Sequence, residues 1–228
     1  MTPMQGDVSL ILSISAALFS VMISVYLLVL WLSYENRLLT DLPLLFGVSF
    51  AFQGANTLIQ ALVSAAIVPD SLDVLRMRAV VILFTVLPMF VAILAIWVHR
   101  YRHYHRRACA VFVVYWSAVV FLAPSPAILM GLLIPLMTAV IAALLLTFIV
   151  TWKTRRLQEI RSGVMAVGLV LIIASQALRV PLMELGLSYV AVFVNALATI
   201  LAVGAFVIPR VRGPLTSRSM PDAHSSLS

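Results

Sequence analysis

The feature that most constrains this chain is a series of seven long apolar runs, at approximately residues 8–31, 43–68, 79–98, 108–122, 127–151, 163–184 and 187–208. A helix that crosses a hydrocarbon core of about 30 Å needs about 20 mostly apolar residues. Hydrophobic residues make up 63% of the chain and charged residues only 10%, too few polar groups to cover a water-soluble globule. The sequence therefore predicts an all-α integral membrane protein, a bundle of seven transmembrane helices.

The fourth run is short, and the sequence Ala-Pro-Ser-Pro follows it at residues 123–126. This sequence is consistent with a tight turn between two full spans or with a break within a re-entrant pair of segments. We favour the turn, because proline has no backbone donor and an irregular segment would be poorly satisfied in lipid.

Basic residues divide unevenly between the two sets of connections that seven crossings create. One set holds twelve of the fifteen, namely Arg37, Arg100, Arg102, Arg106, Arg107, Lys153, Arg155, Arg156, Arg161, Arg210, Arg212 and Arg218. Only Arg76, Arg78 and Arg179 remain for the other side. An excess of Lys and Arg marks the cytoplasmic side, so the sequence predicts an outside N-terminus and a cytoplasmic C-terminus. The net charge of +7 then reflects topology and attraction to anionic headgroups, without nucleic-acid binding.

The chain is predicted to have one membrane domain at residues 1–208 and a disordered cytoplasmic tail at 209–228, which is rich in Ser, Pro and Arg. We expect no attached soluble domain, so that any cytoplasmic output would require a separate chain. The short connections favour a multi-pass protein of the plasma membrane.

Small residues at spacings of three and four form a seam on each of two runs. The first run carries Ser9, Ser13, Ala16, Ser20 and Ser24, and the last carries Ala191, Asn195, Ala198, Ala202 and Ala205. Small side chains allow helices to approach closely in lipid. We expect both seams to face other helices.

Carboxamides lie on one face of the second run. Gln53, Asn56 and Gln60 share this face with Ser49 and Ser64, at steps of three or four residues. Such groups are costly in lipid and must face the bundle interior, a water-filled path or a ligand. One interpretation is interhelical hydrogen bonding to Gln176 and Asn195; the other is a pocket or path for a small polar or anionic solute.

Arg179 is the one charged residue clearly within a predicted span. Its side chain is long enough to reach the outer interface. The alternative is contact with an anion in an outward-facing pocket, or with Asp70 or Asp73 across the bundle.

A basic stretch follows the third run. It contains Arg100, Arg102, Arg106 and Arg107, and Lys153, Arg155 and Arg156 lie on the same predicted side. We interpret these residues as an anchor for anionic lipid headgroups, with partner docking as the alternative. His99 and His103 have metal-ligand spacing, but their cationic neighbours oppose a metal site, and we predict neither metal nor cofactor.

Catalytic arrangements are missing from the runs. They contain no Ser-His, paired-Asp or zinc arrangement, and the single lysine, Lys153, lies in a connection, which excludes a retinal Schiff base. We therefore expect no enzyme, the remaining enzymatic hypothesis being lipid modification by the histidines at 99–105.

The layout, with Arg78 entering the third run and Pro88 in its middle, resembles the seven-helix sensory region that precedes some bacterial and archaeal histidine kinases. This sequence contains no kinase domain, and we assign no family. The main hypothesis is a non-catalytic sensory, receptor-like or accessory subunit that acts through a partner protein or as a homo-oligomer. The alternative is a transporter or channel that uses the polar face of the second run.

Overall fold

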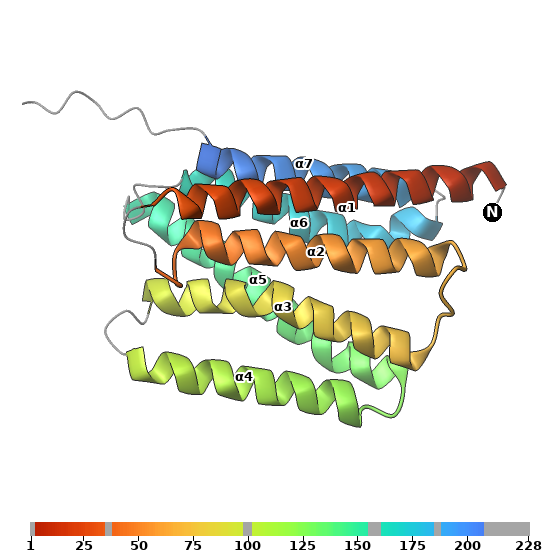
Figure 1. The fold of residues 1–228 in the computed structure, drawn as a ribbon, viewed down its shortest axis with the longest axis horizontal. Helices are drawn as coiled ribbons and strands as arrows, with labels where there is room; N and C mark the ends of the chain where they lie inside the picture. The colour runs from red at the N-terminus through yellow and green to blue at the C-terminus, as the bar shows by residue number, and fades with distance from the viewer. Residues whose placement is uncertain (1–2, 35–37, 98–101, 155–160, 185–187, 208–228) are drawn as a thin grey trace, which may run out of the picture.

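The computed structural model describes residues 3–34, 38–97, 102–154, 161–184 and 188–207, and within them it contains seven helices and no strand (Figure 1). Side chains are described for residues 10–34, 38–97, 104–154, 161–175, 190 and 193–206. The helices are α1 (Pro3–Leu32), α2 (Leu42–Ser64), α3 (Leu72–Trp97), α4 (Arg102–Leu122), α5 (Pro126–Thr154), α6 (Ser162–Glu184) and α7 (Ser188–Val207).

Five of these helices are long and apolar enough to cross a membrane: Leu10–Leu32, Leu42–Ser64, Leu72–Trp97, Tyr104–Leu122 and Pro126–Thr154. In α6 and α7 the described apolar stretches are shorter, Ser162–Ser175 and Phe193–Phe206. The chain thus has the architecture of a helical membrane protein. The fourth and fifth runs form two separate long helices, joined by the short connection 123–125.

The second helix ends earlier than the apolar run, which continues to Val68. Ala66 adopts a left-handed conformation with φ of 55°, and its N–H donates to the carbonyl of Val63. The N–H of Ile67 donates to the carbonyl of Leu62, which completes a Schellman-type C-terminal cap. Backbone geometry, and not hydropathy, ends α2 at Ser64.

Two helices begin about two turns earlier than predicted. Helix α3 begins at Leu72 instead of residue 79, and Ser71 caps it by accepting a hydrogen bond from the N–H of Val74 at 3.3 Å. Helix α4 begins at Arg102 instead of residue 108. Charged residues at both starts lower the local hydropathy, but long cationic side chains are compatible with a helix end at an interface.

Successive helices run antiparallel across the bundle from α1 to α4, and α5, α6 and α7 return behind them (Figure 1). One buried cluster joins α1, α2, α5, α6 and α7 around the ring of Phe46, which contacts the rings of Phe148 and Phe206 at centroid distances of 6.1 and 5.5 Å. A second cluster joins α3, α4 and α5 around Trp116. Helix α5 contributes to both, through Phe148 in the first and Leu133 in the second.

Five described members of the two small-residue seams are buried, as predicted, whereas Ser13, Ala16 and Asn195 are half-buried. In α1, Ser20 and Ser24 are buried, and in α7 the buried members are Ala198, Ala202 and Ala205. The side chains of Ser9 and Ala191 lie outside the described residues.

Candidate functional site

The polar face of α2 packs against α3 in a regular antiparallel register. Ser49 Oγ donates to the carbonyl of Thr85 at 2.9 Å, and Nε of Arg78 donates to Oδ1 of Asn56 at 3.3 Å. Each pair is separated from the other by seven residues on both helices, or about two turns. Between them the rings of Phe52 and Phe84 stack with centroids 4.8 Å apart. The face therefore alternates polar and aromatic contacts with one neighbouring helix.

Arg78 is a site residue that the sequence analysis missed. We placed it at the entry to the third run without a site role, whereas it lies within α3, is half-buried and pairs with Asn56. The sequence analysis named Gln176 and Asn195 as hydrogen-bond partners for the carboxamides of this face, and the described partner of Asn56 is instead Arg78. A signal was available, because Arg78 and Thr85 share the seven-residue spacing of Ser49 and Asn56, but it has meaning only once α2 and α3 are known to be neighbours.

The other predicted carboxamides occupy half-buried positions. Gln53 and Gln60 lie on α2, and Asn195 lies on α7. The backbone carbonyls of these residues accept hydrogen bonds from Thr57, Ser64 and Thr199, respectively, each one helical turn onward. The side chains of Gln176 and Arg179 lie outside the described residues, so their predicted contacts remain predictions.

The start of α3 carries a second cation. Arg76 contacts Asp73 at 3.3 Å, and its other terminal nitrogen donates to the carbonyl of Ala123 at 3.1 Å, which links α3 to the α4–α5 connection. Within the described residues, Nε of Arg76 is buried without a partner. Asp73 thus pairs with Arg76 of its own helix, and the contact with Arg179 suggested by the sequence remains a prediction.

The predicted basic surface lies at one end of the bundle. Arg106, Arg107 and Lys153 are exposed, at the start of α4 and the end of α5. Arg102 is the first residue of α4, and its side chain lies outside the described part of the chain. Arg100, Arg155 and Arg156 also lie outside the described residues. Residues 102–107 form the first turns of α4, ahead of the predicted start of the fourth run at residue 108.

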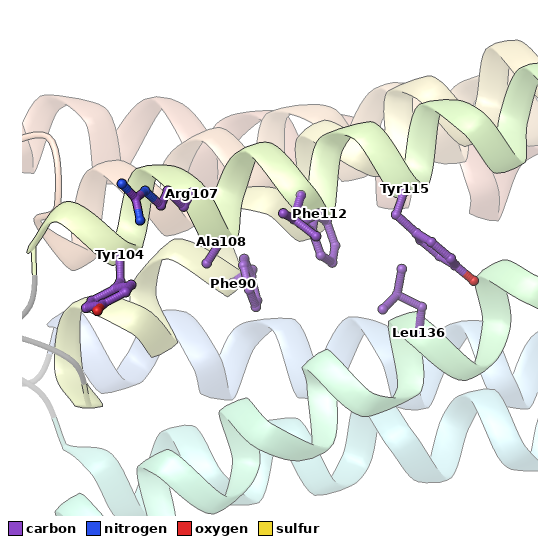
Figure 2. Close-up of a pocket in the computed structure, with 8 residues that line it drawn as sticks. Phe90, Tyr104, Arg107, Ala108, Phe112, Tyr115 and Leu136 are labelled. Carbon is purple, nitrogen blue, oxygen red and sulfur yellow. The ribbon is translucent and has the colours of Figure 1, made fainter.

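A groove of about 510 Å³ lies between α4 and α5, with Phe90 of α3 at its base (Figure 2). Its walls are almost entirely apolar, and its principal lining residues are Phe90, Tyr104, Arg107, Phe112, Tyr115 and Leu136. Figure 2 shows Tyr104 and Arg107 at one end and Tyr115 and Leu136 at the other. The sequence analysis identified Arg107 as a surface cation and gave no sign of the groove beside it.

Comparison of this chain with protein-family models, curated proteins and solved structures gives no match. The functional argument therefore depends on the residues themselves.

Metal-ligating side chains do not gather into a site in the described part of the chain. No group of three His, Cys, Asp or Glu residues there could hold a metal ion.

Another polar contact inside the bundle joins helices: Trp97 Nε1 donates to Thr147 Oγ1 at 2.7 Å. Thr147 in turn donates to the carbonyl of Ala143 in its own helix. This contact ties α3 to α5.

Proposed function

We propose that this chain is a non-catalytic, seven-span membrane subunit that acts through a partner protein as a sensory, receptor-like or accessory component. The observation that carries the proposal is the α2–α3 contact. Ser49 and Asn56 bond to Thr85 and Arg78 of the neighbouring helix. Two of the polar groups on this face are thus engaged in holding two helices together, which is the common use of such groups in membrane bundles.

The proposed topology places the N-terminus outside and the C-terminal end of α7 in the cytoplasm of a plasma-membrane protein. Support comes from the charges at the two ends of the bundle. Arg106, Arg107, Lys153 and Arg161 lie at the end where α4 and α6 begin and α5 finishes, whereas Arg76 lies at the opposite end. Positive residues favour the cytoplasmic side.

The test is purification of the full chain from its native membrane in a mild detergent, followed by mass spectrometry of what remains bound. We expect one protein partner in stoichiometric amount, whose chemistry would identify the process. A matched control is a helical membrane protein of similar size, expressed and purified in the same way. Recovery of a monomer with no stoichiometric partner would overturn the proposal.

A second candidate is a transporter or channel for a small anionic solute, and the position of Arg78 favours it. The guanidinium is half-buried and faces the same α2 surface that carries Gln53, Asn56 and Gln60. A cation inside a bundle is a common element of anion pathways. A transporter requires water along this face of α2, whereas the partner-subunit function is consistent with amide side chains that are packed between helices and excluded from water.

Thiol labelling separates the two functions. In a Cys109→Ala background, Gln53→Cys and Gln60→Cys are each exposed to a membrane-impermeant thiol reagent in intact membranes. The partner-subunit function predicts no reaction at either position within the time that labels Asp73→Cys, whose parent side chain is 88% exposed at the start of α3. Reaction at position 53 as fast as at position 73 would favour the transporter.

A further inference from the structure

We propose that the groove between α4 and α5 binds one anionic phospholipid from the adjacent membrane leaflet. Arg107 would contact the lipid phosphate, and the apolar walls would hold one acyl chain. This inference is independent of the proposed function, since either a partner subunit or a transporter could carry such a site.

The length of the groove matches one leaflet. Arg107 lies near the end of the α4 wall that Tyr104 forms, and Tyr115 lies at the opposite end, eight residues from Arg107, which is about 12 Å along a helix (Figure 2). Half of a bilayer hydrocarbon core is about 15 Å. An acyl chain whose headgroup stands at Arg107 would therefore extend along the groove to about the depth of Tyr115 and Leu136. The volume also lies within the range of about 300–1,000 Å³ that is typical of ligand sites.

The polarity of the groove fits a molecule with one charged end. Arg107 and Tyr104 supply polar groups at the mouth, whereas Phe90, Phe112 and Leu136 give an apolar interior. Arg107 forms no hydrogen bond or ion pair with the other described residues, so its guanidinium is available to a phosphate. Arginine presents several N–H donors and binds phosphate oxygens in a bidentate manner.

The surroundings favour lipid over a second protein helix. The groove opens along α4, whose outer face exposes Val111 and Val114 at 69% and 68%. In a membrane this opening faces acyl chains. Because lipid tails are as apolar as the groove walls, the tail contributes little selectivity. Selection of anionic over zwitterionic lipid must come from the charge at the mouth, where one basic residue gives a preference of about fivefold.

The experiment uses the full chain in vesicles of equal parts phosphatidylcholine and phosphatidylglycerol. The protein is extracted in mild detergent, and the retained lipids are counted by mass spectrometry. We expect phosphatidylglycerol to be retained preferentially, at about one molecule per chain. Arg107→Gln should lower the ratio of retained phosphatidylglycerol to phosphatidylcholine by about fivefold. Arg106→Gln removes the same charge from the next, exposed position and should leave the ratio almost unchanged.

A second pair of variants tests the apolar part. Ala108→Phe introduces a ring into the groove and should abolish retention of both lipids, whereas Val114→Phe, on the same helix outside the lining, should not. The thermal midpoints of the two variants are compared to confirm folding. Equal losses from Arg106→Gln and Arg107→Gln would indicate a diffuse surface charge and overturn the site. Unchanged retention in Ala108→Phe, or a protein chain cross-linked into the groove, would also overturn it.

Discussion

The helix pairs α1–α2 and α6–α7 are joined by small residues, whereas α4 is joined to the bundle by large ones. At Gly54 of α2 an added Cβ would lie 3.0 Å from the carbonyl oxygen of Ala17 in α1. At Gly168 of α6 it would lie 3.1 Å from the carbonyl oxygen of Ala198 in α7. Helix α4 instead packs through Phe112 and the fully buried Trp116, whose Nε1 donates to the carbonyl of Ala79 at 3.0 Å.

The two kinds of contact have different consequences. Lipid tails are as apolar as leucine, so helices associate in a membrane through close packing and hydrogen bonds. Glycine lets two backbones touch along several turns and leaves little room between them. Helix α4 is held by large side chains, Trp116 and Phe112, which are buried together with Val119 and Val120. In the most apolar segment of each helix, 22% of the residues are buried in α4, 28% in α1 and 39% in α2. The groove beside Arg107 lies along this less buried helix.

Replacement of Trp116, the fully buried indole of α4, should have the largest effect on the free energy of unfolding. Trp116→Ala removes a fully buried indole together with its hydrogen bond to Ala79, and we expect a loss of about 3–5 kcal/mol in unfolding free energy. The measurement is reversible unfolding in mixed micelles. The result would show that α4 depends on this one side chain.

Two controls separate size from chemistry. Trp152→Ala removes the same side chain where it is 64% exposed and should change stability by less than about 0.5 kcal/mol. Trp116→Phe keeps a ring but loses the hydrogen bond, and it should have an intermediate effect. If Trp116→Ala were no more destabilising than Trp152→Ala, α4 would be held by distributed contacts, as α1 is.

Replacement within the small-residue contact should have a smaller effect. Gly54→Leu places a side chain where Ala17 and Val21 already approach, and the crowding should cost about 1–3 kcal/mol of unfolding free energy. The same unfolding assay measures it, and α1–α2 cross-linking would report the separation of the two helices.

The matched control is Gly131→Leu in α5, where an added Cβ meets nothing within 4 Å. Leucine is a better helix former than glycine, so this variant should be neutral or slightly more stable. Equal destabilisation at positions 54 and 131 would contradict a close-packed α1–α2 contact.

Hydropathy along the chain predicted all seven helices, and most of their ends agree within a few residues. The larger differences, at the starts of α3 and α4, have one cause. Arg76, Arg78 and Arg106 lower the apolar average, although each is compatible with a helix near an interface. The basic end of the bundle and the inward small-residue seams were also predictable, because charge and side-chain size follow directly from the sequence.

The candidate site was only half predictable. The polar face of α2 follows from the periodicity of Ser49, Gln53, Asn56 and Gln60, but its described partners, Arg78 and the carbonyl of Thr85, do not. A helix in lipid has several apolar faces with similar hydropathy, so the sequence does not specify which neighbour each face meets. The sequence by itself determined where helices form and which end is basic. Only the tertiary structure decided that the polar face of α2 packs against α3 and that a groove lies between α4 and α5. Both features depend on the combined shapes of side chains that are distant along the chain.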